Sequence, residues 1–184
     1  MRIFISGGCK NGKSYHAQRI AKKQSNPAHP LYYIATMKAV DGEDAERIKR
    51  HKNERDGWGF TTVEQPKNIE GILTSCNLNG SFLLDSLTAL LANEMFSPTG
   101  EFDGDAHKRT AAGLTCVLSN VSNIVIVSDY IFSDAFLYDT YTENYRKSLA
   151  TLDRLAAKHC DVVLEAAYTQ LIAHKGGGLL DATD

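Results

Sequence analysis

Residues 7–14 read Gly-Gly-Cys-Lys-Asn-Gly-Lys-Ser, a spacing of glycines, lysine and hydroxyl that suits polyphosphate binding. Gly7 and Gly12 permit backbone angles closed to other residues, so successive N–H groups can converge on phosphate oxygens. Lys13 would then reach the β and γ phosphates, and the Ser14 hydroxyl would hold Mg²⁺. The alternative is a glycine turn with an exposed lysine. The predicted phosphate-binding residues are Gly7, Gly8, Cys9, Lys10, Asn11, Gly12, Lys13 and Ser14.

The chain around this loop has the order that such a loop requires, a strand before it and a helix after it. Short apolar runs alternate with longer amphipathic stretches along the chain, a pattern typical of a parallel sheet covered on both faces. We therefore predict an α/β protein with the three-layer P-loop NTPase-like fold and a mostly parallel central sheet. The predicted strands are 2–6, 31–36, 60–64, 81–85, 124–128 and 161–166, with a weaker candidate at 169–173. The predicted helices are 13–24, 42–54, 86–96, 105–120 and 142–159.

The composition limits the number of domains and the classes of partner that the chain can have. Its 184 residues are 43% hydrophobic, enough for one well-packed domain, which we expect to span residues 1–184. The net charge of −2 provides no cationic field for nucleic acid or an anionic membrane surface. No apolar run approaches the ~18 residues of a membrane span, so we expect no membrane insertion. Residues 97–105 read as a surface loop, and Gly176–Gly178 as the start of a frayed tail.

The four cysteines are scattered without the paired spacing of a zinc site or a disulfide framework. This favours reduced thiols and a cytoplasmic protein.

A phosphate loop also needs a second group on the metal side, usually an aspartate at the end of a neighbouring buried strand. Asp85 meets that requirement because it closes the apolar run 82–84 and precedes a predicted helix. Its alternative role is to cap that helix through backbone N–H groups. Asp129, after the apolar run 124–128, is a weaker candidate of the same type.

The segment 43–55 is rich in basic residues and has almost no apolar stripe. Arg47, His51 and Arg55 are spaced i, i+4, i+8 and form one row on a helix. One interpretation is a solvated face whose acidic neighbours balance the charge. The other is a triphosphate platform in which the His51 imidazole attacks phosphorus while the cations stabilise the transferring group.

At these residues the chain resembles the bifunctional adenosylcobinamide kinase/adenosylcobinamide-phosphate guanylyltransferases of cobalamin biosynthesis. After the phosphate loop, that family has a strand ending Tyr-Ile-Ala-Thr, an Arg-Ile-x-x-His-(Lys/Arg)-x-x-Arg helix, a Thr-x-Glu strand and a Leu-Leu-Asp-(Cys/Ser)-Leu-Thr run leading to Asn. The resemblance covers about residues 1–96. The matching residues here are Tyr33–Thr36, Arg47, Ile48, His51, Lys52, Arg55, Thr62, Glu64, Leu83–Thr88 and Asn93.

The second half departs from the family pattern. Where the family shows a glycine-rich Asn-Glu-Val-Gly segment, this chain has residues 128–134 without glycine, and Lys147 replaces an aspartate. Asp153 and Arg154 stand where Asn-Gln is common. The aromatic residues of this half could form a wall for a large corrinoid, a subunit contact or ordinary core packing. They are Tyr130, Phe132, Phe136, Tyr138 and Tyr141.

The resemblance implies two reactions. A kinase step would move the γ-phosphoryl of ATP or GTP to adenosylcobinamide, with Lys13 and a Mg²⁺ ion on Ser14 and Asp85 stabilising charge. A guanylyl step would form a GMP-histidine intermediate at His51 and pass GMP to adenosylcobinamide phosphate. The resemblance also implies a homotrimer. The further nucleotide contacts that it implies are Ala35, Thr36, Met37, Lys52, Asn53, Glu54, Arg55, Glu64 and Asp85.

Two other functions remain compatible with the sequence. One is a P-loop small-molecule kinase of the same ancestry without guanylyl transfer, which the altered second half would allow. The other is a nucleotide-dependent regulatory or binding protein, in which the loop acts as a switch. His51 discriminates among the three, since a switch has no need of a covalent histidine.

Overall fold

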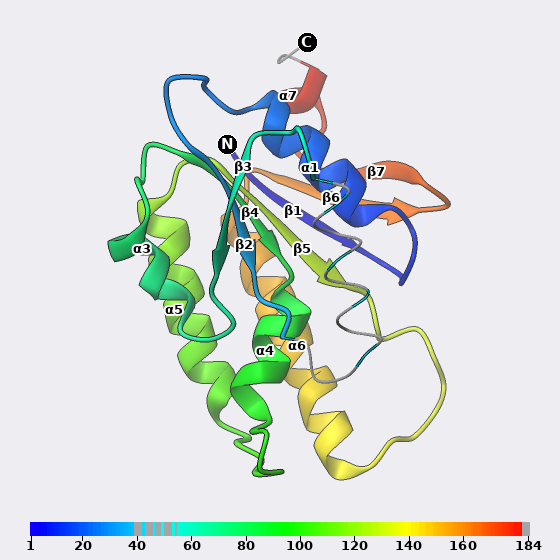
Figure 1. Ribbon diagram of the computed structural model, residues 1–184. Coiled ribbons are helices and arrows are strands. Elements are labelled where there is room, and N and C mark those ends of the chain that lie inside the picture. The colour runs from blue at the N-terminus through cyan, green and yellow to red at the C-terminus, as the bar shows by residue number, and fades with distance from the viewer. Residues whose placement is uncertain (39–41, 43–45, 47–48, 50–52, 54, 182–184) are drawn as a thin grey trace.

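The computed structural model describes residues 1–38, 42, 46, 49, 53 and 55–181. Its centre is a seven-stranded sheet in the order β3-β2-β4-β5-β1-β6-β7 (Figure 1). Every adjacent pair is parallel except β6 and β7, so the predicted mostly parallel sheet is confirmed. The strands are β1 (Arg2–Gly7), β2 (Leu31–Ala35), β3 (Phe60–Glu64), β4 (Ser81–Asp85), β5 (Ile124–Asp129), β6 (Val162–Ala167) and β7 (Gln170–Lys175).

Helices cover both faces of this sheet and complete three layers (Figure 1). The helix α1 lies on one face, and α4, α5 and α6 lie on the other with the short η1 and α3 segments. None of the described helices is long and apolar enough to cross a bilayer. The helices are α1 (Lys13–Lys23), η1 (Ile69–Gly71), α3 (Ile72–Ser75), α4 (Leu87–Met95), α5 (Ala106–Asn120), α6 (Thr140–His159) and α7 (Gly178–Asp181).

The central strands are buried on both sides, as their continuous apolar runs predict. Alternate residues point to opposite faces: Phe82 and Leu84 of β4 pack with the α4–α6 layer, whereas Leu83 packs with the α1 layer. The same alternation separates Phe4 from Ile3 and Ile5 in β1. The sheet therefore divides two apolar cores, one under each helical layer.

Two regions differ from the sequence prediction. The turn η1 and helix α3 are absent from it because they are too short to show helical periodicity, although Ile69 and Ile72 are fully buried. The predicted frayed tail at Gly176–Gly178 is wrong, since α7 begins at Gly178 and Leu180 packs against the α1-side core. Burial of Leu180 favours this helical turn over fraying. Most of the predicted helix 42–54 lies outside the described residues.

The carboxyl ends of β2 and β4 are joined by a buried hydroxyl. The Thr36 Oγ1 donates to the Ser86 carbonyl oxygen and accepts from the Ser86 N–H, both at 2.7 Å. The Asn93 side-chain amide donates to the Thr36 carbonyl oxygen at 2.7 Å. Because Thr36 has no exposed surface, water cannot replace these contacts.

We predict that Thr36→Val lowers the free energy of unfolding by about 2 kcal/mol, because the Ser86 backbone groups lose their buried partner. Urea denaturation measures this change. Thr110→Val is the matched control, since the Thr110 hydroxyl is also buried but, among the described residues, bonds only to the Ala106 carbonyl of its own helix. Equal losses in the two variants would contradict a special role for Thr36.

Candidate functional site

The phosphate loop connects the end of β1 to the start of α1, as the sequence predicts. Gly12 is the N-cap residue of α1 with a φ of 80°, and Lys10 also has a positive φ of 60°. Within the described part of the chain, no side chain caps this helix start, and its first turn contains no acidic residue. The first N–H groups of α1 are therefore directed to the space above the loop, where an anion is favoured.

The beginning of the loop is fixed between two strands. Gly7 pairs with Asp129 of β5 on one side and with Ala166 of β6 on the other. A Cβ atom at Gly7 would collide with the Ala166 carbonyl oxygen. The Tyr130 N–H donates to the Gly7 carbonyl oxygen at 2.8 Å. Only glycine fits here, because the backbone of β6 occupies the space of a side chain.

Lys13 is buried inside the loop, with 6% of its surface exposed. Its Nζ lies 2.8 Å from Asp129 Oδ1 and donates to the Gly8 carbonyl oxygen at 2.6 Å. The alternative of an exposed lysine on a glycine turn is therefore wrong. The ammonium group is held over the carboxyl ends of β1 and β5, and its charge is directed toward β5.

Two aspartates end the neighbouring strands β5 and β4, and the first of them pairs with this lysine. Asp129 ends β5, and its N–H bonds to the Thr88 hydroxyl at 2.8 Å. Asp85 ends β4, and its Oδ2 accepts from the Tyr33 hydroxyl at 2.8 Å. The N-cap of α4 is Ser86, whose hydroxyl accepts from the Ala89 N–H at 3.2 Å. Ser86 therefore caps α4. The Asp85 carboxylate does not cap the helix and lies at the carboxyl end of β4, on the same end of the sheet as the loop.

Hydroxyl and carboxylate oxygens are the donors that Mg²⁺ prefers. Such oxygens are supplied by Ser14 at the start of α1 and by Asp85 and Asp129 at the ends of β4 and β5. The residues present therefore fit a magnesium ion. No group of three His, Cys, Asp or Glu side chains gathers closely enough to hold a metal among the residues that the structure describes. Phosphate oxygens and water would therefore complete the coordination, as Mg²⁺ commonly requires.

The other predicted nucleotide contacts on β2 and β3 are separated from the loop strand β1 by β4 and β5. The Ala35 carbonyl oxygen accepts from the Gln65 N–H at 2.9 Å, and Glu64 ends β3 with an exposed side chain. Thr36 is fully buried and its hydroxyl is engaged by Ser86, so its side chain positions the chain. Met37 follows it and is partly exposed.

Arg55 is buried, which a purely solvated basic face does not explain. Its guanidinium carbon lies 3.5 Å from the centre of the Tyr33 ring, a cation–π contact, and its Nη2 lies 3.5 Å from Thr62 Oγ1. An open hollow of about 470 Å³ adjoins it. Arg55, Tyr33 and Asp85 form a continuous path from the β2–β3 edge to the carboxylate beside the loop. The residues lining the hollow are Arg55, Asp56, Gly57, Gly59, Phe60 and Thr62.

The predicted nucleophile His51 lies outside the described residues, as do Lys52 and Glu54. Asn53 is helical and exposed.

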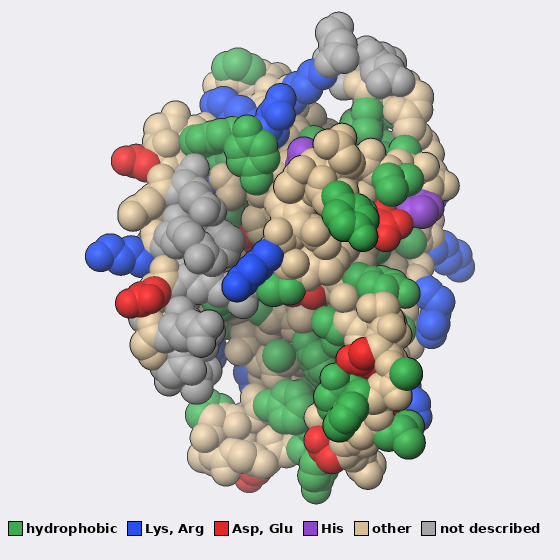
Figure 2. Space-filling model, turned by 90° about the vertical axis from the view of Figure 1, so that its right-hand side faces the viewer, with side chains coloured by type: hydrophobic (Ala, Val, Ile, Leu, Met, Phe, Trp, Pro, Cys, Tyr) green, Lys and Arg blue, Asp and Glu red, His purple; other side chains and the backbone are tan. Residues whose placement is uncertain are grey.

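The aromatic residues after β5 divide into two groups. Phe132 packs against the core, whereas Tyr130 is 49%, Phe136 68%, Tyr138 40% and Tyr141 58% exposed. Core packing therefore accounts for the first group only. Figure 2 shows hydrophobic side chains gathered on the lower part of this face of the molecule.

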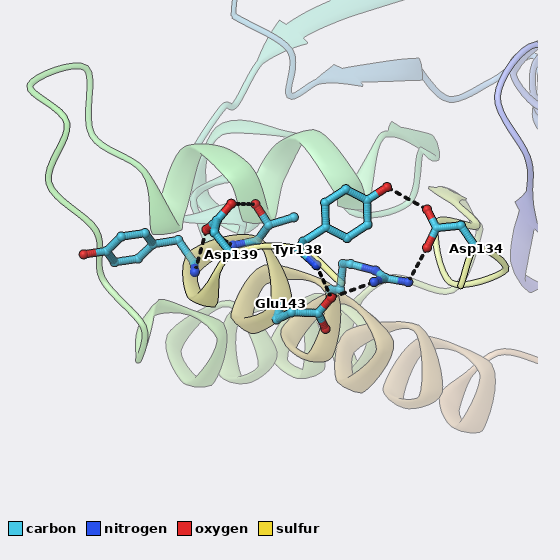
Figure 3. A network of polar contacts seen from close by, with 7 residues as sticks. Asp134, Tyr138, Asp139 and Glu143 are labelled. Atoms are coloured by element: carbon cyan, nitrogen blue, oxygen red, sulfur yellow. Dashed lines mark hydrogen bonds and ion pairs between the residues drawn. The ribbon is translucent and has the colours of Figure 1, made fainter. Parts of the chain in front are cut away.

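The exposed segment is held by an arginine to which the sequence alone assigns no role. Arg146 of α6 bonds to Asp134 at 2.9 Å and to Glu143 at 2.8 Å, and Tyr138 donates its hydroxyl to Asp134 at 2.7 Å (Figure 3). Asp139 caps α6 by accepting from two backbone N–H groups. The sequence does place Glu143 three residues before Arg146, but such oppositely charged pairs are common on helix surfaces.

Asp153 is a second residue whose environment the sequence did not predict. Burial on α6 raises the pKa of its carboxyl from the ordinary 3.8 to about 7, and the neighbouring Asp129 charge acts in the same direction. A hydrogen bond with Ser128 and the charge of Arg154 oppose this shift. Its Oδ1 is buried with no hydrogen-bond partner among the described residues. An acid kept neutral here avoids an unpaired buried charge.

We predict that stability falls as the pH rises from about 4 to about 8. A carboxyl whose pKa is raised on folding stabilises the fold while it is protonated, and this stabilisation is lost as pH passes the folded pKa of about 7. Asp153→Asn should remove most of this dependence and raise the free energy of unfolding at pH 8 by about 2 kcal/mol. Urea denaturation at pH 5 and pH 8 measures both effects, with the exposed Asp56→Asn as control. A variant with the parent's pH dependence would contradict this account.

Comparison with solved structures supports the fold. A solved ATPase domain matches 94% of this chain and 76% of its own length, with a TM-score of 0.50 at 10% identity. A KaiC-like protein of the archaeon Pyrococcus horikoshii matches 95% of this chain and 79% of its own, with a TM-score of 0.51 at 12% identity. Identities this low establish the fold alone, and the predicted P-loop NTPase-like fold is confirmed.

Comparison with curated proteins gives closer relatives. The bifunctional adenosylcobalamin biosynthesis protein CobU of Escherichia coli is 33% identical over 107 residues, 57% of this chain and 56% of the relative. CobU of Salmonella typhimurium is 32% identical over 104 residues, so the matches span just over half the length of these two proteins. CobP of Pseudomonas aeruginosa is 28% identical over 165 residues, 89% of this chain and 91% of the relative.

The family model described as cobinamide kinase / cobinamide phosphate guanyltransferase matches residues 3–169. This range contains the phosphate loop, both strand-end aspartates and the β6–β7 turn up to Thr169. The chain therefore belongs to the cobinamide kinase / cobinamide phosphate guanyltransferase family.

Proposed function

We propose that this protein is a transferase of cobalamin biosynthesis that phosphorylates adenosylcobinamide with ATP or GTP and then transfers GMP from GTP to the phosphorylated product. The observation that carries the proposal is the buried Lys13, fixed in a glycine loop and paired with Asp129 at the end of the adjacent strand. A structural lysine has little reason to be buried next to uncapped helix N–H groups. Membership in the family supplies the two substrate classes.

In the kinase step, catalysis consists mainly of positioning and charge stabilisation. The backbone N–H groups of residues 8–14 would hold the phosphate oxygens, and Lys13 would neutralise charge on the transferring group. Asp129 orients the Lys13 ammonium at 2.8 Å. Mg²⁺, held by Ser14 and Asp85 when bound, would offset the charge of the β and γ phosphates. The oxygen of the acceptor hydroxyl bonds to the γ phosphorus, the bond from that phosphorus to the bridging β-phosphate oxygen breaks, and the hydroxyl proton passes to solvent.

In the guanylyl step, a ring nitrogen of His51 attacks the α phosphorus of GTP and pyrophosphate leaves. A phosphate oxygen of adenosylcobinamide phosphate then attacks the same phosphorus and displaces the histidine. The assignment of His51 rests on the family motif, in which Arg55 is the last residue. Arg55 is buried on the Tyr33 ring beside β3, a position that supports anion binding near the ends of β2 and β3.

A homotrimer and a cytoplasmic location belong to the same proposal. The first rests on the family resemblance. The second is supported by the four cysteines, all of which are free.

We predict that incubation with GTP labelled at the α phosphate gives an acid-labile, alkali-stable protein adduct, because a phosphoramidate forms at histidine. The His51→Ala variant should show no label, whereas His29→Ala should label like the parent. Quenched samples separated by gel and counted provide the measurement. An unlabelled parent under all metal conditions would instead favour a kinase without guanylyl transfer or a nucleotide-dependent binding protein.

We predict that Asp85→Asn lowers the kcat of Mg²⁺-dependent phosphoryl transfer to adenosylcobinamide by about 100-fold, because one charged metal ligand is lost. Asp129→Asn should also lower kcat, by about 10-fold or more, since Lys13 loses its orienting partner. Transfer of γ-labelled phosphate measures both, and thermal melting verifies folding. The exposed Glu101→Gln is the control. An Asp85→Asn variant with parental activity would leave that residue only a contact for the Tyr33 hydroxyl.

A further inference from the structure

The direction of Lys13 determines how a polyphosphate must lie in the loop. Its Nζ is aimed at Asp129, on the β5 side of β1. Because this lysine reaches the β and γ phosphates, the terminal phosphate lies toward β5. The strands β5 and β6 pair with opposite edges of β1. The α phosphate and the nucleoside of a phosphoryl donor therefore leave the loop on the β6 side.

The tip of the β6–β7 hairpin lies on that side, next to both ends of the loop (Figure 1). Ala166, near the end of β6, pairs with Gly7 where the loop begins. The Thr169 carbonyl oxygen lies 3.0 Å from His16 Nε2, in the first turn of α1 where the loop ends. The hairpin is thus tied to the loop at two points, and Tyr168 lies between them in sequence.

Tyr168 and Thr169 form a two-residue turn between Ala167 and Gln170, which are paired. Both have positive φ, 50° and 61°, as this kind of hairpin turn requires. Asn-Gly adopts these angles at far lower cost than a tyrosine followed by a β-branched residue. Tyr168 is 90% exposed, so its ring contributes nothing to the core that would offset this strain. A contact with a ligand would explain why a large aromatic residue occupies this strained turn.

We propose that Tyr168 is the stacking surface for the purine base of the phosphoryl donor whose phosphates occupy residues 7–14. This inference rests on the proposed kinase step. An aromatic face stacks on any nucleobase, because every base has a π-face, and so accepts either adenine or guanine. The two contacts of the hairpin with the loop fix the backbone that carries the ring, so stacking orders only the side chain.

This base position differs from the guanine contacts that the family motif implies at the ends of β2 and β3. Three strands, β4, β5 and β1, separate β2 from β6. At a strand spacing of ~4.8 Å, β2 and β6 lie about 19 Å apart, too far for one base to contact both. Tyr168 therefore serves the phosphoryl donor, and the nucleotide that labels His51 uses the other flank.

The test is equilibrium binding of adenosine and guanosine β,γ-imidotriphosphates, with inorganic triphosphate as the base-free probe, all with Mg²⁺. We expect Tyr168→Ala to weaken binding of the adenosine compound roughly 10-fold, with unchanged affinity for inorganic triphosphate. Tyr168→Phe should bind like the parent, because it keeps the ring. The matched control is Tyr141→Ala, which removes an exposed tyrosine from the start of α6. In Tyr168→Trp, the nucleotide but not inorganic triphosphate should quench the added fluorescence above the Trp58 background.

Equal affinity of the parent and Tyr168→Ala for the adenosine compound would overturn the inference and leave the proposed function intact. A parallel loss of affinity for inorganic triphosphate would also overturn it, because the loop itself would then be damaged. A parent that binds none of the three probes would instead overturn the proposed function, and this inference with it.

Discussion

The close approach of three backbones at Gly7 is the constraint on which the site depends. Here β1 ends between β5 and β6, and the Ala166 carbonyl occupies the volume of a missing side chain. This contact determines where the loop leaves the sheet, and hence where α1 begins. Every charged group of the site is then positioned relative to that exit: Lys13 above it, Asp129 beside it and Asp85 one strand further.

The strand order gives the site two flanks with different chemistry. The β5–β4 flank carries the carboxylates and leads into the aromatic segment after Asp129. The β6–β7 flank carries an antiparallel hairpin with little charge at its tip. In a purely parallel sheet, a crossover helix would follow β6, and Tyr168 would not lie in a tight turn that is tied to the loop. The single antiparallel strand is thus a functional part of the fold.

Much of this arrangement could be predicted from the sequence. Buried parallel strands have continuous apolar sequences, and here the residues that follow these runs are the candidate functional ones. All seven strands lie within two residues of their predicted positions, and the loop and its helix lie where the sequence places them. Contacts between distant segments could not be predicted. Neither the burial of Arg55 on Tyr33 nor the packing of α6 near Ser128, which makes Asp153 a buried acid, leaves a periodic signal. The sequence ranks Asp129 below Asp85 because strand adjacency, which brings Asp129 to Lys13, is not encoded locally.

The pairing of Lys13 with Asp129 has a consequence for which anions the protein can admit. An incoming anion must displace a carboxylate that is already within hydrogen-bonding distance of the ammonium. Free orthophosphate brings only a few oxygens and no counter-ion, so it exchanges one partner for another with little net gain. A metal-chelated triphosphate brings a cation that offsets the displaced carboxylate and many more acceptors for the backbone. By this comparison of charges, the ion pair favours a metal-chelated polyphosphate over free orthophosphate at the loop.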